Sequence, residues 1–291
     1  MAAPLLLADV PWLLYRSFFA LPSSITDADG RPVNALLGTA NALLSAVDAR
    51  SPRAVVACFG AEGAAYRIAL YPPYHAQRPP MPDELAWQWE RAPAFLGAFG
   101  WTVHDSSELE ADDVMYSYAR AEAEAGASRR ALLLTGDRDM YQAVDDQVSV
   151  LELGKGGAPP RDLDAAEVRR RYGIPPALVP DFIALRGDPS DNLPGAPGIG
   201  EKGARDLLLR HGSLAAAIAG SITERPRVGA ALRDNAELLR SFREIATLVR
   251  IDGVVAPQDR ATDKLGGAAA AEALGMRRLA TRLRREAGGA G

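Results

Sequence analysis

Short, mostly apolar runs alternate with longer amphipathic segments along the first two-thirds of the chain. Four such runs predict buried parallel strands, at Leu5–Ala8, Ala54–Phe59, Ala131–Thr135 and Val148–Leu151. Between them, the spacing of apolar positions predicts helices over Asn34–Ala49 and Asp112–Ala125. Strands that alternate with helices indicate an α/β fold with a doubly wound, parallel central sheet flanked by helices.

This alternation ends in two places. Tyr71–Pro82 holds five prolines in twelve positions, which no regular helix tolerates in its interior, so we expect an excursion with a helix resuming near Asp83. Gly154–Pro160 is typical of a loop or linker. After it the pattern is helical, over Asp164–Tyr172, Pro176–Leu185, Glu201–His211 and Val228–Val249. The Ala-rich piece from Ala268, with five arginines between Arg277 and Arg285, is expected to fray.

Composition narrows the class of protein. With 291 residues, 48% of them hydrophobic and 24% charged, the chain is globular, with one large domain or two small ones. No apolar run approaches the ~20 residues that cross a bilayer, so we expect a cytoplasmic protein without a membrane partner. Cys58 is the single cysteine, and the three histidines lie far apart. A metal would therefore be held by carboxylates rather than by Cys or His clusters.

The acidic residues are unevenly distributed. The formal net charge is -4, from 33 basic and 37 acidic residues. Eight acids sit in tight groups: Asp9, Glu110, Asp112, Asp113, Asp137, Asp139, Asp188 and Asp191. Without them the remainder is mildly basic, with 33 basic against 29 acidic residues. A basic body around an acidic centre fits a polyanionic substrate that metal ions bridge.

Two of these groups lie where predicted elements begin or end. Glu110-Ala-Asp-Asp113 opens a helix, with Glu110 and Asp113 on one face and Asp112 off it. Acids also favour helix N-termini for capping alone, and that reading stays open. In Thr135-Gly-Asp-Arg-Asp139, a glycine after a buried strand permits a sharp turn that brings two carboxylates to the sheet edge. An ordinary solvated turn is the alternative there.

The last group precedes a glycine-rich turn. Arg186–Pro194 contains two acids three residues apart, and Gly195–Ala204 then opens a helix. Such a turn offers backbone amides to a phosphate, although a plain connection between helices has the same composition. Four acidic groups can share one pocket only if cations offset their repulsion. Oxygen ligands suit Mg²⁺ or Mn²⁺, and two such ions would support hydrolysis of a phosphodiester.

Four motifs together resemble one known family. Asp9–Pro22, Glu110–Asp113, Thr135–Asp139 and Asp181–Lys202 are similar, in order and spacing, to the bacterial 5'-3' exonuclease and flap endonuclease family, which includes the N-terminal domain of DNA polymerase I and related phage enzymes. The resemblance runs from about Leu5 to about Val255. It implies a PIN-like nuclease core at 1–173 with an arch at 71–92, a helix-three-turn-helix DNA-binding region at 174–260, and a basic helical tail at 261–291.

The resemblance also implies an activity and its residues. It predicts a free-standing, monomeric, metal-dependent 5' nuclease that cleaves DNA, and to some extent RNA, at flaps and 5' ends. Asp9, Glu110, Asp112 and Asp113 would hold or orient a first Mg²⁺ or Mn²⁺ ion, and Asp137, Asp139, Asp188 and Asp191 a second. Catalytic positions would be Arg67, Tyr74, His75 and Arg78. DNA, with a K⁺ ion, would be bound by the turn containing Gly195, Gly198 and Gly200, and by Lys202.

Two positions depart from the family pattern. Gly60 stands where the family has an aspartate after the second strand, and Glu62 is the nearest acid that could replace it. His75 stands where the family has a lysine that neutralises the scissile phosphate, and a histidine is mostly uncharged at neutral pH. We therefore predict activity that prefers Mn²⁺ and increases in His75→Lys. The main alternative is a structure-specific DNA-binding protein of the same fold with weakened catalysis; a PIN-type ribonuclease is a further one.

Overall fold

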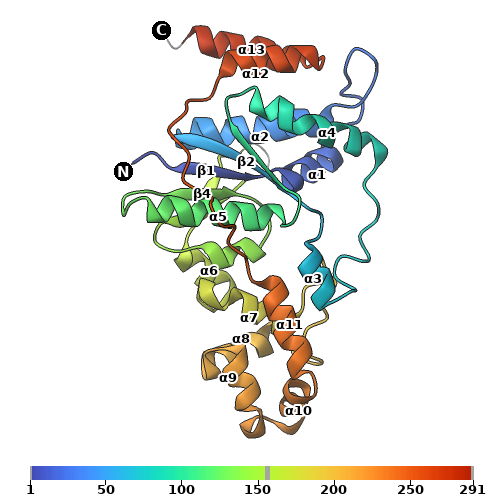
Figure 1. Ribbon diagram of the computed structural model, residues 1–291, viewed down its shortest axis with the longest axis vertical. Coiled ribbons are helices and arrows are strands. Elements are labelled where there is room, and N and C mark those ends of the chain that lie inside the picture. The colour runs from blue at the N-terminus through green and yellow to red at the C-terminus, as the bar shows by residue number, and fades with distance from the viewer. Residues whose placement is uncertain (1, 155–157, 290–291) are drawn as a thin grey trace.

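The computed structural model describes residues 2–154 and 158–289, and their centre is a six-stranded sheet (Figure 1). Its strands are β1 (Leu5–Asp9), β2 (Ala54–Gly60), β3 (Thr102–Ser106), β4 (Ala131–Leu134), β5 (Val148–Glu152) and β6 (Arg161–Leu163). They lie in the order β3-β2-β1-β4-β5-β6. All neighbours pair in parallel except β6, which runs antiparallel to β5. The predicted α/β class with a parallel central sheet is confirmed.

Helices cover both faces of the sheet and form one end of the molecule. The α-helices are α1 (Val10–Ala20), α2 (Asn34–Arg50), α3 (Ala65–Leu70), α4 (Asp83–Gly97), α5 (Ala111–Glu124), α6 (Ala165–Tyr172), α7 (Val179–Arg186), α8 (Glu201–His211), α9 (Leu214–Ala219), α10 (Pro226–Asp234), α11 (Ala236–Ala246), α12 (Lys264–Ala273) and α13 (Arg277–Gly288). Short 3₁₀ helices span Asp139–Ala143, Pro176–Leu178 and Ser221–Thr223. No helix among the described residues is long and apolar enough to span a membrane.

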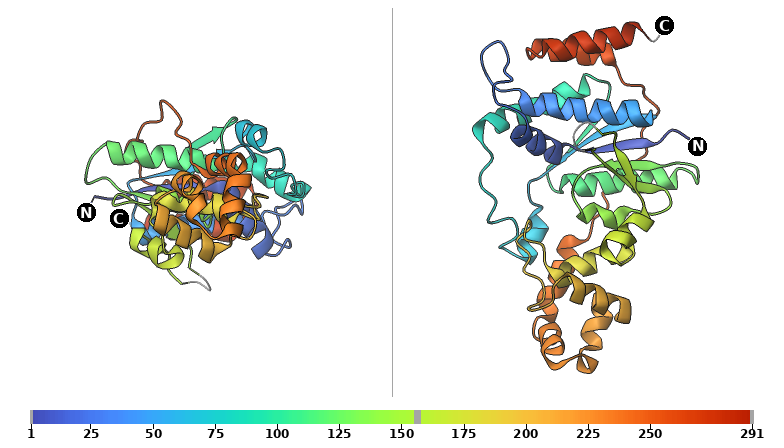
Figure 2. Two further views of the ribbon diagram at one scale, coloured as in Figure 1. Left: turned by 90° about the horizontal axis from the view of Figure 1, so that it is seen from below. Right: turned by 180° about the vertical axis from the view of Figure 1, so that it is seen from behind.

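The central strand β1 contributes to two hydrophobic cores because alternate side chains point to opposite faces. Leu5 and Leu7 pack into the core shared with α5 and α7, whereas Leu6 and Ala8 pack against α1 and α2. A strand covered on both faces has no polar positions to alternate with, which explains its uniformly apolar sequence. Figure 2 shows α1, α2 and α4 on one side of the sheet and α5 and α6 on the other.

The helices α7 to α11 form the end of the molecule opposite α12 and α13 (Figures 1 and 2). The single helix predicted over Val228–Val249 is wrong, since α10 and α11 meet at Asn235. The Asn235 side-chain amide donates to the Ala231 carbonyl at 2.9 Å, and its backbone leaves the helical region. The side chain of an asparagine competes with the backbone of the helix for hydrogen-bond partners, and this can end a helix. The spacing of apolar residues carries no signal of such a break.

The C-terminal piece does not fray within the described residues, contrary to prediction. α12 and α13 form a hairpin that buries Leu279, Ala280 and Leu283 in the core of α2 and α4. Alanine and glycine in α12 let it lie close to this core, and Gly267 packs directly on the Phe99 ring. Tyr71–Pro82 contains no helix, as predicted. The expected linker Gly154–Pro160 lies partly outside the described residues, which omit 155–157.

Candidate active site

Two carboxylates meet where β1 and β4 end side by side. Asp9 is the last residue of β1 and caps α1, with Oδ1 accepting from the Trp12 amide at 3.0 Å. Its Oδ2 accepts from the Thr135 hydroxyl at 2.7 Å. The same hydroxyl accepts from the Asp137 amide at 3.0 Å. Thr135 therefore links the carboxylate that ends β1 to the turn that carries the acids after β4.

The start of α5 supplies acids that point in two directions. Glu110 is the residue before the helix, and Asp113 completes a reciprocal capping box with it. Glu110 accepts from the Tyr74 hydroxyl at 3.1 Å and from the Ala64 amide at 2.9 Å. Asp112 lies on another side of the helix, where the carboxylates of Asp137 and Asp9 are the charges that act on it most strongly. The structure thus brings Asp112 together with the acids of β1 and β4.

Asp113 is placed elsewhere, inside the protein. It has no exposed surface, and its two oxygens accept from the Arg67 guanidinium at 2.8 and 2.9 Å. The Val249 amide donates to the same carboxylate at 2.8 Å. Arg67 is 3% exposed, also contacts Glu110 at 3.1 Å, and donates to the Ile245 carbonyl. This pair joins α3, α5 and the end of α11, so these two expected site residues lie behind the pocket.

A third acidic segment follows α7. Asp188 accepts from the Ser190 amide and hydroxyl and pairs with Arg186 at 3.1 Å. Asp191 faces His75 Nε2 at 3.0 Å and Arg78 Nη2 at 3.1 Å. The sequence places these acids more than 100 residues from His75, and the fold connects them directly to the proline-rich excursion.

Tyr74 and His75 form a stacked pair at the base of that excursion. Their ring centroids are 3.8 Å apart with an interplanar angle of 22°. His75 Nδ1 lies 2.7 Å from the Glu62 carbonyl, so both ring nitrogens face acceptors. Its backbone is left-handed, with φ of 57°. Tyr74 is buried, and burial together with Glu110 raises its pKa well above its usual range. The fold therefore fixes both rings between Glu110 and Asp191.

The gathered acids raise one another's pKa. Loss of contact with water, followed by the charges of Asp137 and Asp9, raises the pKa of Asp112 well above its ordinary value. The pKa of Asp139 is raised in the same way, first by burial and then by the charges of Asp137, Asp191 and Asp188. Partial removal of its carboxylate from water raises the pKa of Asp137 to about 7, and the charge of Asp191 contributes to this rise. Part of the residue still faces solvent. Cationic charge at this place would stabilise the ionised forms.

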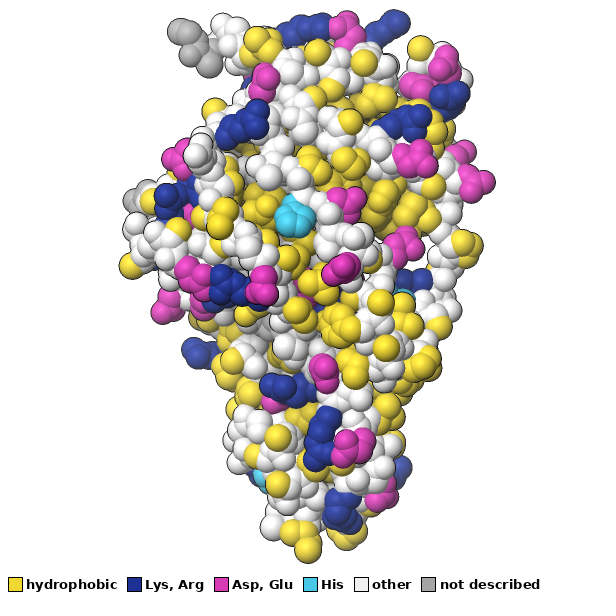
Figure 3. Space-filling view, in the orientation of Figure 1, with side chains coloured by type: hydrophobic (Ala, Val, Ile, Leu, Met, Phe, Trp, Pro, Cys, Tyr) yellow, Lys and Arg dark blue, Asp and Glu magenta, His cyan; other side chains and the backbone are white. Residues whose placement is uncertain are grey.

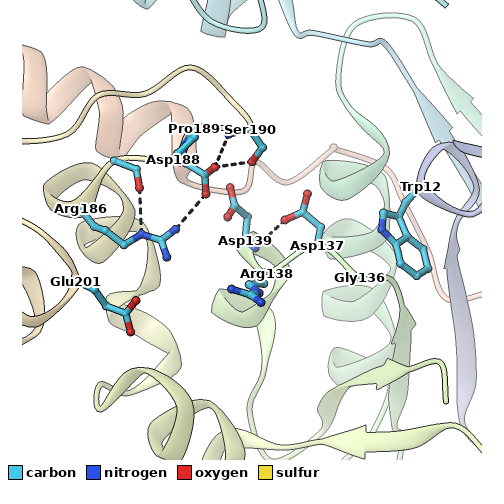
Figure 4. Close-up of a pocket in the computed structure, with 11 residues that line it drawn as sticks. Trp12, Gly136, Asp137, Arg138, Asp139, Arg186, Asp188, Pro189, Ser190 and Glu201 are labelled. Atoms are coloured by element: carbon cyan, nitrogen blue, oxygen red, sulfur yellow. Dashed lines mark hydrogen bonds and ion pairs between the residues drawn. The ribbon is translucent and has the colours of Figure 1, made fainter. Parts of the chain in front are cut away.

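An open pocket of about 650 Å³ lies over this cluster (Figure 4). It is lined by Trp12, Gly136, Asp137, Arg138, Asp139, Arg186, Gly187, Asp188, Pro189, Ser190 and Glu201. Figure 4 shows Asp139 and Asp188 turned toward each other across it. Within the described ranges, no three His, Cys, Asp or Glu side chains form a compact group ready for a metal ion. The carboxylates are spread around a pocket rather than closed on one point.

Gly60 is a backbone crossing point. A Cβ atom built there would lie 2.5 Å from the Leu109 carbonyl oxygen, the Glu110 carbonyl carbon and the Ala111 nitrogen. The next residue, Ala61, donates its amide to the Leu109 carbonyl at 3.0 Å. The missing family aspartate therefore has no space here. Glu62 does not replace it, because its side chain is exposed and lies near Tyr15.

We expect Gly60→Asp to destabilise the protein by about 1–3 kcal/mol, as overpacking does, because the start of α5 must move. The same movement shifts Glu110 and Asp112, so cleavage should fall rather than rise. Urea unfolding and a cleavage assay on the same preparation measure both effects. Gly288→Asp is the matched control, since nothing lies within 4 Å of its added Cβ. Wild-type stability with increased activity in Gly60→Asp would contradict this prediction.

The glycine-rich turn before α8 adopts conformations that need glycine. Gly195 and Gly198 have φ of 67° and 77°, and a side chain on Gly195 would strike the backbone of Gly187. Gly200 precedes the first turn of α8 and has open space where its side chain would be. Lys202, in that first turn, is exposed. Free amides and an exposed cation at a helix start suit an anionic backbone.

Sequence reasoning did not assign three residues that bond to or pack on the acidic segments. Thr135 joins Asp9 to Asp137, Trp12 packs its ring on Gly136, and Arg186 pairs with Asp188. Each lies within three residues of a predicted acid, and that proximity was the available signal. The partners of Thr135 and Trp12 are more than 120 residues away, so the sequence did not indicate the contacts themselves.

Comparisons with known proteins agree with this arrangement. Residues 4–173 match the family model described as 5'-3' exonuclease, N-terminal resolvase-like domain, and residues 174–262 the one described as 5'-3' exonuclease, C-terminal SAM fold. A 5'-3' exonuclease of Mycobacterium tuberculosis is 39% identical over 236 residues, which cover 74% of this chain and 72% of the relative. DNA polymerase I of Mycobacterium bovis is 38% identical over 247 residues, 84% of this chain and 27% of that protein. The chain thus spans about a quarter of such polymerases.

Among solved structures, the T5 D15 protein co-crystallised with metal ions superposes with a TM-score of 0.70 at 14% identity, covering 97% of both chains. This likeness establishes the fold: an α/β core with a helical C-terminal part. The chain belongs to the 5'-3' exonuclease family. The predicted family and enzyme class are thereby confirmed.

Proposed function

We propose that this protein is a metal-dependent, structure-specific 5' nuclease that hydrolyses DNA phosphodiesters at junctions between single strand and duplex. One observation carries the proposal. Asp137, Asp139 and Asp188, from the turn after β4 and the loop after α7, line one open pocket. Asp9 of β1 and Asp112 at the start of α5 lie close enough to Asp137 that burial and the charges of these acids together raise the pKa of Asp112 and Asp137. Such a site is poised for cations and for an anionic substrate.

The donor set fits hard divalent cations. The pocket acids offer oxygen ligands alone, as Mg²⁺ or Mn²⁺ prefers. In this proposal Asp9, Glu110 and Asp112 would hold or orient one ion, with Asp113 acting behind them through its capping contact to Glu110. Asp137, Asp139, Asp188 and Asp191 would hold a second. When bound, two such ions supply the charge stabilisation that in-line displacement at phosphorus requires.

Side chains of the excursion position the substrate in this proposal. His75 and Arg78 converge on Asp191, which places the His75 ring and the Arg78 guanidinium beside the acids where a phosphate would lie. Tyr74 holds Glu110 and stacks on His75, so it fixes both rather than reacting itself. Arg67 positions Glu110 through its buried pair with Asp113. We assign these four residues to binding and positioning of the scissile phosphate and its acids.

Duplex DNA would bind at the far side of the pocket, along α8. Glu201 and Asp188 line the same pocket, so the α8 start lies beside the acids. The amides and carbonyls from Gly195 to Gly200, with Lys202, would hold the duplex backbone, and the carbonyls suit a K⁺ ion. Action on RNA, a monomeric state and a cytoplasmic location belong to this proposal as well.

Incubation with a labelled 5'-flap duplex and Mn²⁺ tests the proposed function. We expect cleavage near the junction, loss of it on chelation, and little action on the same duplex with a 3' flap. If the protein binds the flap but does not cleave it with any divalent ion tested, the result supports the alternative, a DNA-binding protein of this fold.

His75→Lys is expected to increase cleavage severalfold at pH 8, where a lysine keeps its charge and a histidine does not. The substitution gives up the contact to the Glu62 carbonyl but keeps a partner for Asp191. Initial rates of flap cleavage at pH 6 and pH 8 measure the effect, with His75→Gln as the uncharged control. A lysine variant no faster than the parent at pH 8 counts against this role.

A further inference from the structure

The α12–α13 hairpin lies beyond residue 262, where the match to the family ends. Its charge differs from that of the rest of the chain. Residues 264–291 contain six of the 33 Lys and Arg residues but two of the 37 Asp and Glu residues. The segment is therefore strongly basic in a chain whose net charge is -4. Figure 3 shows Lys and Arg side chains along the top of the molecule, over α13.

The hairpin holds its basic face in a fixed orientation. Leu279, Ala280 and Leu283 of α13 are buried against the core, so the opposite face must point outward. Arg282 donates to Asn41 Oδ1 of α2 at 2.8 Å, and Lys264 pairs with Glu286 at 2.9 Å. The first contact joins the hairpin to α2, the second joins α12 to α13 within it, and Lys264 also pairs with Asp48 of α2 at 3.6 Å. The outward arginines are thus presented by a rigid element rather than by a loose tail.

One side of α13 forms an arginine cradle, which we define as the exposed Arg277, Arg278, Thr281 and Arg285 together with the partly buried Arg282. These residues line a shallow hollow of about 380 Å³. Within residues 2–154 and 158–289, Arg277, Arg278 and Arg285 form no ion pair. The other two arginines of the helix do: Arg282 with Glu286 and Arg284 with Glu272. Guanidinium groups on successive helical turns suit a chain of phosphates.

One aromatic ring with two cations lies on α4, on the side of the molecule that carries the proline-rich excursion. Trp87 on α4, the helix that follows the proline-rich excursion, has the Arg91 guanidinium 4.0 Å and the Arg31 guanidinium 5.7 Å from its ring centroid. Arg31 belongs to the loop before α2. The hairpin turn at Gly275, two residues before Arg277, packs on that loop at Asp27. An aromatic ring beside basic side chains is typical of surfaces that bind single strands.

We propose that the arginine cradle of α13 binds the phosphate backbone of the single-stranded 5' tail of the substrate, beyond the junction. The proposal rests on the proposed nuclease function. A single strand is favoured over duplex because the proposed duplex site at α8 lies at the opposite end of the molecule (Figures 1 and 2). The strand leaving the pocket on the α4 side continues toward the cradle. The hairpin would then lengthen the binding site for long tails.

The proposed role of the arginine cradle is tested with two substrates that share the same duplex. One has a 5' tail of a few nucleotides, and the other has a long 5' tail. Binding is measured without divalent ions at several salt concentrations, using the parent and Arg277→Gln/Arg278→Gln/Arg285→Gln. We expect the parent to bind the long tail more tightly. The triple variant should lose about tenfold affinity for the long tail and keep that for the short tail. Its log-log salt slope on the long tail should fall by about 2, from three phosphate contacts at ~0.7 each.

The control variant Arg169→Gln/Arg240→Gln/Arg250→Gln removes the same charge from exposed positions on other elements, and it should retain the preference for the long tail. Circular dichroism checks that both variants are folded. Equal binding of both tails by the parent, or an equal loss on both tails in the cradle variant, would overturn the proposal. If the proposed nuclease function is wrong, the parent will cleave neither substrate. The binding comparison does not depend on cleavage, so it still tests the arginine cradle.

Discussion

Asp137→Asn is expected to reduce flap cleavage at least 1,000-fold while leaving duplex affinity within about threefold of the parent. Asparagine preserves the shape of the side chain and can still accept from the Asp139 amide, which Asp137 bonds at 2.9 Å. It removes the charge that a divalent cation requires. The duplex is expected to bind along α8, away from this side chain, so its affinity should persist.

Single-turnover cleavage and equilibrium binding on one flap substrate measure the two quantities separately. Asp146→Asn is a suitable control, because this exposed acid lies in the turn between β4 and β5 and outside the pocket. Parallel loss of cleavage and duplex affinity in Asp137→Asn would contradict a catalytic assignment for this acid.

Arg67→Ala is expected to destabilise the protein by about 3–5 kcal/mol, because it leaves Asp113 buried without a charge partner. Asp113 is fully buried and receives two hydrogen bonds from Arg67. The loss also separates α3 and α11 from the start of α5, so Glu110 loses its fixed position. Urea or thermal unfolding measures the effect, and residual cleavage at low temperature reports on Glu110.

Two further variants separate the buried pair from general charge effects. Arg78→Ala, at a largely exposed arginine that pairs with Asp191, should change stability by less than about 1 kcal/mol. Arg67→Met/Asp113→Leu removes both charges together and should recover most of the stability lost in Arg67→Ala. A double variant as unstable as the single one would show that packing, rather than the unpaired charge, dominates.

Elements buried on both faces were predictable from sequence, and partly exposed ones were not. β1, β2, β4 and β5 have apolar runs because helices cover both of their faces. β3, at the sheet edge, was missed because its residues Thr102–Ser106 are half-buried or exposed and include His104 and Asp105. β6 has three residues, two of them exposed, and pairs antiparallel with β5. A strand so short leaves no periodic signal.

The candidate site divides in the same way. Acids directly after apolar strands, such as Asp9 and Asp137, could be placed at one sheet edge because parallel strands end together. The inward direction of the Asp113 side chain could not be predicted, because it depends on Arg67 and Val249, which contact it from distant segments. The space at Gly60 depends in the same way on the backbone of Leu109–Ala111. Local patterns therefore located the acids, whereas their partners required the fold.

The position of β1 in the sheet has a consequence for synthesis on the ribosome. β1 is made first but pairs on one side with β2 and on the other with β4, whose residues emerge about 120 residues later. Until then the backbone N–H and C=O groups along one edge of this apolar strand stay unpaired. Such edges can pair with other chains. Truncations that stop before Ala131 should therefore aggregate, and a nascent chain of this length is where a chaperone would be needed most.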